Sequence, residues 1–167
     1  MKPNYQCITV TKEESLLDVL NKIMKHDIQS VPVLEGEKFV GLISKQMIYE
    51  AYFNRDEQLT KEQFLSEMKA QDIVRHEDLY ITKEDVLEKT ITSFKGFPIL
   101  AVVDQEMNFL GIVTRFEVLE EFESAFGVRK SGVRIAFTSI EEEGRISRVT
   151  DILDSYHSNI ISIATFD

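Results

Sequence analysis

The chain has 167 residues, of which 43% are hydrophobic and 29% are charged, as is usual for a globular protein with its own hydrophobic core. The net charge of −10 argues against nonspecific nucleic-acid binding, which requires basic patches. A single cysteine, Cys7, excludes an internal disulfide, and no apolar run is long enough to cross a bilayer, so we expect a cytoplasmic protein with neither a nucleic-acid nor a membrane partner.

The N-terminal residues predict a strand followed by an amphipathic helix. Residues 7–10 are a short apolar run that indicates a strand. Thr11 and Glu14 then have the spacing of a capping box, which predicts the start of a helix. The apolar residues that follow recur on one helical face: Leu16, Leu20, Ile23 and Met24.

Two strands and a second helix come next. Residues 31–34 are a β-branched run that indicates a strand, in which Pro32 is expected near the start or at an unpaired position. A turn at residues 35–38 leads into a strand at 39–43, and a helix begins at Lys45. The predicted order of this first unit is therefore β-α-β-β-α.

A polar segment separates this unit from the next. Between residues 55 and 71, Thr60 and Gln63 again have capping-box spacing. The apolar residues behind them are Phe64, Leu65 and Met68. We expect a short amphipathic linker helix here.

The second half repeats the order from residue 72. A lead-in at residues 72–74 precedes a strand at 79–81 and a helix at 85–94, which Gly96 and Pro98 end. The chain starts almost on its first strand, so we expect the first unit to lack a counterpart of this lead-in.

Two strands and a helix close the second unit. The strands are expected at 99–103 and 109–113, with a turn at 104–108 between them. In the helix that follows, Val118, Leu119 and Phe122 lie on one face.

A repeat connects the two halves. Residues 109–115 read Phe-Leu-Gly-Ile-Val-Thr-Arg, and residues 39–45 read Phe-Val-Gly-Leu-Ile-Ser-Lys, class for class the same. The copies then differ, because Met47 stands where the second copy has Glu117. Such a repeat indicates one supersecondary unit used twice, in each case a strand that ends in a hydroxyl where a helix begins.

The remaining residues follow a different pattern. Residues 133–138 alternate as a strand with one buried face, and residues 159–163 indicate a second strand. Between them lies a helical stripe of Ile146, Val149, Ile152, Leu153 and Tyr156. This predicts one β-α-β unit, which must pack on the rest of the protein, on a partner chain or on a further segment to bury enough surface.

The doubled unit, with the strand-to-helix motifs at 41–47 and 111–117, resembles a tandem pair of CBS domains at residues 1–54 and 72–126, joined by the linker 55–71. The tail at 127–167 resembles the first half of an ACT domain, and the whole layout is similar to bacterial CBS-CBS-ACT regulators of the acetoin-utilisation type. The resemblance implies an α+β fold, with two β-α-β-β-α repeats packed about a pseudo-two-fold axis and a C-terminal half ACT-like (ferredoxin-like) β-α-β unit.

CBS pairs bind adenosine compounds, so the resemblance implies AMP, ADP, ATP, S-adenosylmethionine or a cyclic dinucleotide such as cyclic di-AMP as regulatory ligand, with no cofactor and no metal. Carried over to this sequence, Thr114 and Glu117 hold phosphate and ribose, although the acid of the family pattern is usually Asp. Arg115 adds positive charge at the start of a helix. The residues expected against adenine are Ile73, Val74, Ile99 and Leu100.

Other interpretations stay open. Thr114 and Glu117 also form a capping box, which satisfies N–H groups of the helix without any ligand. In the first copy Met47 replaces the acid, so Ser44 and Lys45 are expected to form a second, degenerate site. His76 could contact a phosphate, but a solvated loop residue is favoured.

The sequence thus predicts a non-catalytic sensor that binds an adenine nucleotide, forms a homodimer through its CBS helices and passes a conformational change to the tail. An amino acid at the ACT-like segment, near Gly144 and Asn159, is a less favoured ligand. The main alternative is a ligand-free dimerisation or interaction module. An enzyme has only scattered acids and histidines in its favour.

Overall fold

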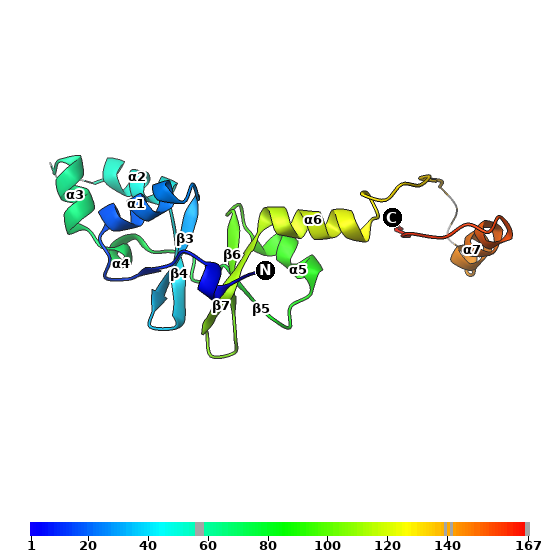
Figure 1. Ribbon diagram of the computed structural model, residues 1–167, viewed down its shortest axis with the longest axis horizontal. Coiled ribbons are helices and arrows are strands. Elements are labelled where there is room, and N and C mark those ends of the chain that lie inside the picture. The colour runs from blue at the N-terminus through cyan, green and yellow to red at the C-terminus, as the bar shows by residue number, and fades with distance from the viewer. Residues whose placement is uncertain (56–58, 139, 141, 166–167) are drawn as a thin grey trace. The chain divides into compact units, whose positions relative to one another are not determined.

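The computed structural model describes residues 1–55, 59–138, 140 and 142–165 (Figure 1). The chain divides into two compact units, Met1–Val118 and a second unit from Leu119 onward. Each unit is described by itself below. The linker residues 56–58 lie outside the described residues.

The first repeat forms a three-stranded sheet in the order β2-β3-β4, in which β2 is parallel to β3 and β4 is antiparallel to it. Its strands are β2 (Val10–Thr11), β3 (Ser30–Glu35) and β4 (Lys38–Ser44). The helices of this part of the chain are α1 (Leu16–Lys25), α2 (Lys45–Phe53), α3 (Lys61–Glu67) and α4 (Ala70–Ile73). The predicted β-α-β-β-α order is confirmed.

The second repeat carries a four-stranded sheet in the order β1-β7-β6-β5. Its strands are β1 (Lys2–Pro3), β5 (Tyr80–Thr82), β6 (Ile99–Val103) and β7 (Phe109–Thr114). The 3-10 turn η1 (Asn4–Gln6) follows β1, and the helices are α5 (Leu87–Ser93) and α6 (Arg115–Ala125). The same order of elements thus recurs, as the repeat in the sequence predicts.

Contrary to the expectation that the first unit lacks a lead-in, β1 takes this role, and the two repeats exchange their lead-in segments. The N-terminal strand β1 pairs with β7 of the second repeat, where Lys2 lies opposite Ile112. In return, the lead-in of the second repeat reaches β4, where Arg75 N donates to Leu42 O at 3.3 Å and Leu42 N donates to Arg75 O at 2.7 Å. Each sheet is therefore completed by the other repeat, in agreement with the expected pseudo-two-fold relation.

Glycine allows this close approach in both strands. A Cβ at Gly41 would lie 2.6 Å from Arg75 O, and a Cβ at Gly111 would lie 2.2 Å from Lys2 O. Neither distance is compatible with a side chain, because both obstacles are backbone atoms. The glycine common to the two repeated motifs thus has a packing reason in each copy.

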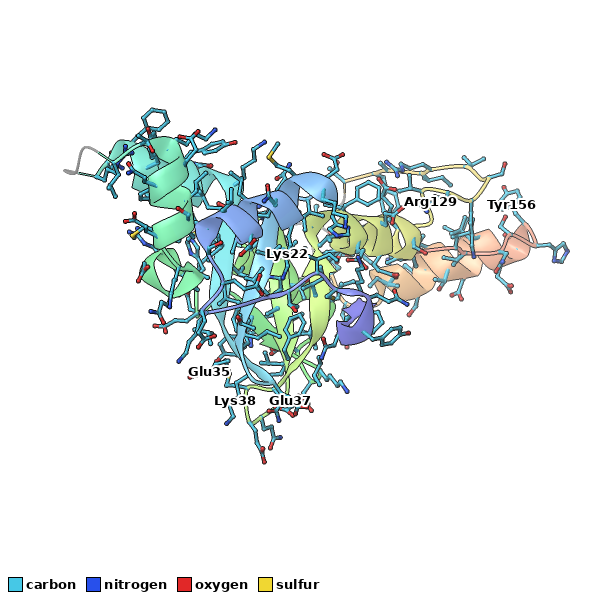
Figure 2. The ribbon with its side chains drawn as sticks, turned by 60° about the vertical axis from the view of Figure 1, so that its left-hand side comes forward. Lys22, Glu35, Glu37, Lys38, Arg129 and Tyr156 are labelled. Atoms are coloured by element: carbon cyan, nitrogen blue, oxygen red, sulfur yellow. The ribbon has the colours of Figure 1, made fainter. Side chains whose placement is uncertain are left out.

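The tips of the two hairpins are also joined. Phe39 N donates to Met107 O at 3.0 Å, and Phe109 N donates to Glu37 O at 2.8 Å. Figure 2 shows Glu35, Glu37 and Lys38 together at the tip of the first hairpin. The repeats are therefore connected by backbone hydrogen bonds at the tips as well as at the lead-ins.

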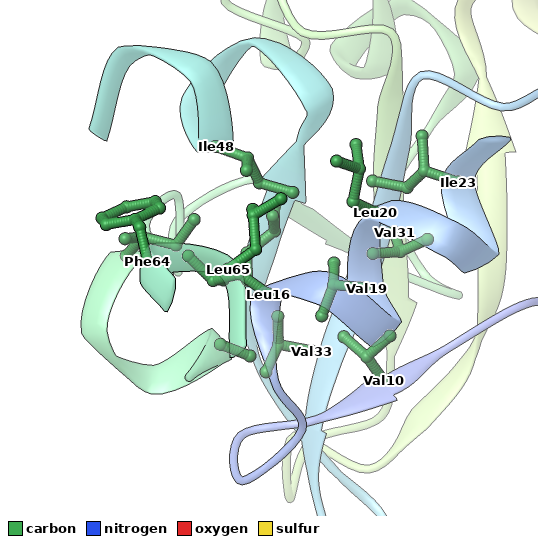
Figure 3. Packing of buried hydrophobic residues seen from close by; sticks show 13 residues of the cluster. Val10, Leu16, Val19, Leu20, Ile23, Val31, Val33, Ile48, Phe64 and Leu65 are labelled. Atoms are coloured by element: carbon green, nitrogen blue, oxygen red, sulfur yellow. The ribbon is translucent and has the colours of Figure 1, made fainter. Parts of the chain in front are cut away.

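The core of the first repeat includes the linker helix. Buried apolar side chains from α1, β3 and α2 pack with Phe64 and Leu65, which are 3% and 5% exposed (Figure 3). Thr60 and Gln63 form the predicted capping box of α3, with both of its hydrogen bonds present. The segment expected as a linker is thus an integral part of the first repeat.

The start of α1 differs from the prediction. Glu14 accepts a hydrogen bond from Thr11 N, but the chain only turns there, and the helix begins after Ser15, whose Oγ accepts from Asp18 N at 3.1 Å. A serine with an acid three residues later provides the stronger cap. Met24 is 60% exposed, so its assignment to the buried face is wrong.

Three further corrections concern a strand, the start of a helix and one face of a helix. The predicted strand at 7–10 is limited to β2, because η1 and the turn after it occupy the preceding residues. The helix predicted from residue 85 begins only at Leu87, because Asp85 Oδ2 instead accepts hydrogen bonds from Thr82 N and Thr82 Oγ1. On α6, Val118 is buried as expected, whereas Leu119 is 53% exposed.

In the second unit, the helix predicted from the stripe is present as α7 (Arg145–Ser155). Residues 133–138 and 159–163 are described but form no strand, so the expected β-α-β unit is wrong in its strands. A strand needs a neighbour for its N–H and C=O groups, and the described residues of this unit supply none.

An amino-acid site near Gly144 and Asn159 stays a prediction. No helix among the described residues is both long and apolar enough to pass through a membrane.

Candidate functional site

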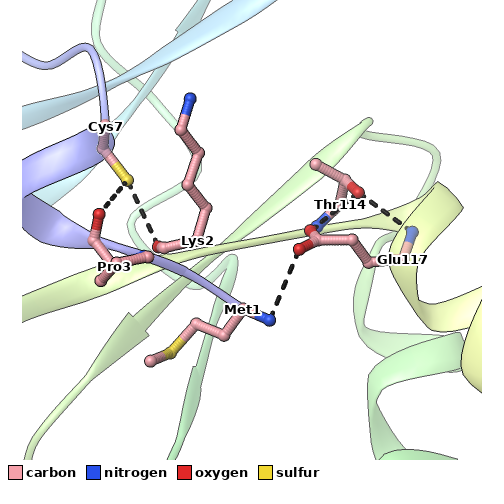
Figure 4. Close-up of polar contacts among 6 residues, drawn as sticks. All are labelled: Met1, Lys2, Pro3, Cys7, Thr114 and Glu117. Carbon is pink, nitrogen blue, oxygen red and sulfur yellow. Dashed lines mark hydrogen bonds and ion pairs between the residues drawn. The ribbon is translucent and has the colours of Figure 1, made fainter.

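The strand-to-helix junction of the second repeat has the geometry of a closed capping box. Thr114 ends β7, and its Oγ1 accepts a hydrogen bond from Glu117 N at 3.1 Å. In return, Glu117 Oε2 accepts from Thr114 N at 2.8 Å and from Thr114 Oγ1 at 2.9 Å. The carboxylate and hydroxyl therefore meet at the start of α6 (Figure 4).

The second oxygen of Glu117 faces a cation. Its Oε1 lies 3.4 Å from the N-terminal ammonium of Met1, which β1 brings to this place (Figure 4). Partial burial by itself raises the pKa of Glu117, but the hydrogen bonds from Thr114 and the nearby ammonium outweigh it. They hold the pKa of Glu117 below its ordinary value of 4.5. The side chain is thus a carboxylate at neutral pH, an acceptor for hydroxyl groups.

Arg115 is held against the segment that enters β6. Its Nη2 donates to Phe97 O at 2.9 Å, and its guanidinium lies 5.6 Å from the centre of the Phe94 ring. Arg115 N donates to Pro98 O at 3.1 Å. The positive charge expected beside the site is present, but its hydrogen bond to Phe97 must change or be shared for it to reach a ligand.

The four apolar candidates divide between the two repeats. Ile99 lies directly opposite Thr114 in the sheet, and Leu100 lies opposite Val113. Residues opposite each other on neighbouring strands have adjacent side chains, so Ile99 is next to Thr114.

The other two apolar candidates lie with the first repeat. Ile73 belongs to the core of that repeat and Val74 packs against it. Val74 Cγ2 would lie 2.8 Å from a Cβ on Gly41, in the strand that carries Ser44. Ile99 therefore lies beside Thr114 in the second repeat, whereas Ile73 and Val74 pack in the first repeat.

The corresponding junction of the first repeat is simpler. Ser44 ends β4 and its Oγ accepts from Met47 N at 3.2 Å, while Lys45 Nζ lies 5.8 Å from the Tyr49 ring centre. Ser30, opposite Ser44, is 6% exposed, and its Oγ has no hydrogen-bond partner among the described residues. A buried hydroxyl without a partner requires an explanation, such as a bound water or ligand.

Phe97 and Met1 lie beside the site, although neither is among the site residues that the sequence predicts. The His76 and Phe97 rings are 4.7 Å apart, and Phe97 is also the residue that binds Arg115. His76 is one of the phosphate contacts that the sequence leaves open, whereas Phe97 is not among its predicted site residues. The sequence does contain a signal for Phe97. It precedes Pro98, and a residue before proline favours the extended backbone that leads into a strand, here β6 beside the junction. The position of Met1 had no local signal.

Two hollows in the second repeat lie away from this junction. One, of about 400 Å³, lies around β5 and α5 and is lined mostly by charged and hydroxyl side chains, including those of Asp78, Asp85 and Lys89. Another of similar size lies near Lys83 and Asp104. In both, the lining charges are solvated or paired with each other. Neither includes Thr114, Arg115 or Glu117.

The CBS domain family matches residues 1–54 and 70–124. The structure has two β-α-β-β-α repeats with exchanged lead-ins, and the last strand of each repeat ends in a hydroxyl residue where a helix begins. The chain belongs to the CBS domain family.

Three similar proteins illustrate the relationship. An uncharacterised protein of Methanocaldococcus jannaschii is 27% identical over 115 residues, which are 67% of this chain and 39% of that protein. The chain thus spans about two fifths of the length of this curated relative. The CbpB protein of Listeria monocytogenes in complex with c-di-AMP has a TM-score of 0.65 and 26% identity, with 77% of this chain and 95% of that chain covered. CBSX2 in complex with AMP has a TM-score of 0.64 over 78% of this chain and 95% of that chain, and at 22% identity it shows the fold alone.

Proposed function

We propose that this protein is a non-catalytic sensor that binds an adenine nucleotide at the Thr114–Glu117 junction. The observation that carries the proposal is the arrangement of this junction. A carboxylate with a lowered pKa, a hydroxyl and the N-terminus of an eleven-residue helix meet at one point. A carboxylate accepts hydrogen bonds from both hydroxyls of a ribose, and helix N–H groups favour phosphate.

Each side chain has a separate task in this proposal. Glu117 exchanges its bond to the Thr114 backbone for the ribose diol, Thr114 Oγ1 turns to a phosphate oxygen, and Arg115 adds charge. Ile99 offers apolar surface to adenine from the strand beside Thr114, whereas Leu100 is 0% exposed and has no surface to offer in this structure. The c-di-AMP bound by the Listeria relative supports this class of ligand. AMP, ADP, ATP, S-adenosylmethionine and cyclic di-AMP all contain the adenosine group that these contacts recognise.

The first repeat offers a second, degenerate site. Ser44 and Lys45 can meet a phosphate, and Ser30 provides a free buried hydroxyl next to Ser44. Ile73 and Val74 would serve this site, since Ile73 belongs to the core of the first repeat and Val74 lies beside Gly41 in the strand that carries Ser44. Met47 has no group to hold a ribose, so we expect weaker binding here.

Transmission of the signal begins at α6. Thr114 directly precedes this helix, Glu117 lies in its first turn, and residues from Leu119 onward belong to the second unit. A ligand that replaces the cap changes the start of the helix that leads into the tail. The size of any such change is limited by the difference in the ligand's affinity for the two states.

A second candidate function is a ligand-free dimerisation module. Its support is the apolar surface on the two equivalent helices: Phe53 on α2 is 80% exposed, and Phe116 on α6 is 69% exposed. We propose a homodimer through these helices with or without a ligand. The closed capping box at Thr114 and Glu117 needs no ligand, which is consistent with this alternative.

The decisive experiment is a thermal-shift panel of the five adenosine compounds on the wild-type protein, Glu117→Ala and Ser44→Ala. A ligand at a hundredfold excess over its Kd stabilises by about 2.7 kcal/mol. For a protein of this length, that corresponds to roughly 5–11 °C. We expect one compound to give such a shift, which Glu117→Ala abolishes and Ser44→Ala retains.

Glu121→Ala, on the same helix, is the matched control for the loss of an acid and should keep the shift. If no compound stabilises the wild-type protein while Glu117→Ala lowers the melting temperature by itself, the capping box is the whole role of Glu117. The protein is then a ligand-free dimerisation module.

A further inference from the structure

The first repeat contains a buried hydroxyl group without a partner. Ser30 is 6% exposed, and among the described residues its Oγ has no hydrogen-bond partner. A buried hydroxyl without a hydrogen bond is unfavourable, so such groups usually meet a water or a ligand. Ser30 is the first residue of β3 and lies directly opposite Ser44, the last residue of β4. Opposite residues have adjacent side chains, so this hydroxyl lies at the strand-to-helix junction.

Helix α2 begins at the same junction and has nine residues. The first turn of a helix has N–H groups without an intrahelical partner. Lys45 N donates to Gln29 O at 3.0 Å and Met47 N donates to Ser44 Oγ at 3.2 Å, which leaves Gln46 N without a bonded acceptor among the described residues. The first turn contains Lys45 and no acid. This helix start therefore favours a negatively charged group.

The two repeats differ at the two positions that decide which ligand each junction can take. The second repeat has Glu117 in the first turn of its helix and Ile99 opposite its junction. The first repeat has Met47 and Ser30 in these places. A carboxylate accepts hydrogen bonds from a sugar but repels an anion, and an apolar side chain suits a base but not a charge. The first repeat thus lacks both features of a nucleoside site and has a hydroxyl donor instead.

We propose that the junction of the first repeat binds a small oxyanion of the phosphate type that carries no nucleoside. Ser30 Oγ, Ser44 Oγ and Gln46 N donate to its oxygens, and Lys45 supplies positive charge. Ser44 Oγ still accepts from the helix, because a hydroxyl donates and accepts at the same time. The low exposure of Ser30 limits the ligand to a small group. The inference builds on the degenerate site of the proposed function, to which it assigns its own ligand, but it does not require a nucleotide at the other junction.

A titration of the full-length, ¹⁵N-labelled chain with inorganic phosphate tests the proposal through the amide chemical shifts. A parallel titration with sodium chloride at matched ionic strength controls for general screening of charges. We expect saturable shifts at Ser30 and at residues 44–47 with phosphate and only small, unsaturable shifts with chloride. Adenosine, which has no phosphate, should leave these amides unchanged.

Three variants assign the shifts to the site. Ser30→Ala removes a hydroxyl that has no partner, so it should leave the fold intact and weaken phosphate binding by about tenfold or more. Met47→Glu gives the first junction the acid that Glu117 provides in the second, which completes a capping box with Ser44 and should abolish phosphate binding. The matched control is Ser15→Ala, which removes the N-cap serine of α1 in the same repeat and should leave the affinity for phosphate unchanged.

Three outcomes would overturn the proposal. Phosphate binding that survives Ser30→Ala would mean that this hydroxyl meets only a buried water. Equal shifts with phosphate and chloride at residues 44–47 would exclude an oxyanion site. If adenosine shifted these amides as phosphate does, the junction would be a nucleoside site. The thermal-shift panel depends on Glu117, whereas these shifts depend on Ser30, so either proposal can fail while the other stands.

Discussion

Glu117 has two distinct interactions, one oxygen accepting from Thr114 and the other facing the N-terminal ammonium. Both favour the ionised form, which explains the lowered pKa despite partial burial. The sequence indicated the bond to Thr114, because residues three apart at a helix start form capping boxes. It could not indicate Met1, because only the exchange of lead-in strands brings that residue near.

The pH dependence of stability follows from this pKa. A carboxyl group whose pKa is lower in the folded state binds fewer protons there than in the unfolded chain, so its stabilising effect is present above the unfolded value and lost as the pH falls through the folded one. Urea unfolding of the wild-type protein should therefore show an advantage over Glu117→Gln at neutral pH. That advantage should vanish as the pH falls below 4.5 through the lowered pKa.

The glutamine variant retains the shape of the capping box and removes only the charge. Glu121→Gln on the same helix controls for general loss of a negative charge, and its difference from wild type should not change in this way. A constant difference between wild type and Glu117→Gln at all pH values would contradict the assigned pKa.

Among the elements, strands with a strong local pattern were predicted well and elements without a partner were not. β3, β4, β6 and β7 are apolar runs between turn residues, and each lies within a residue or two of its expected place. Residues 133–138 have an equally clear alternation yet form no strand. Alternation shows which face could be buried, whereas a strand also requires hydrogen-bond partners that the sequence of one segment does not contain.

For the linker helix α3, the local structure could be predicted from the sequence, but its packing in the core could not. Its capping box was predicted from Thr60 and Gln63, but its place in the core of the first repeat was not. Leu65 is 5% exposed there, so Leu65→Ala should lower the free energy of unfolding by about 2–5 kcal/mol. Leu17→Ala on α1, where Leu17 is 40% exposed, should cost much less. Urea denaturation of both variants makes the comparison, and similar losses would argue against α3 as part of the core.

At the level of the whole molecule, the exchange of lead-ins makes the two repeats one structural unit. β1 belongs to the second sheet, Arg75 is bonded to the first sheet, and the hairpin tips are joined by two further hydrogen bonds. Any rotation of one repeat against the other must break bonds at three places. If the protein is the proposed sensor, we therefore expect the signal to pass along α6 and not through the angle between the repeats.

This connection predicts that the unit Met1–Val118 unfolds in a single step. Leu42 in the first sheet is 0% exposed and Leu79, before the second sheet, is 1% exposed, so Leu→Ala at either place should remove about 2–5 kcal/mol. Because elements that unfold together share one free energy of opening, each variant should lower the hydrogen-exchange protection of β4 and β7 equally. If Leu79→Ala instead reduced protection in β7 and left β4 unchanged, the repeats would be independent folding units, and rotation between them would again be available for signalling.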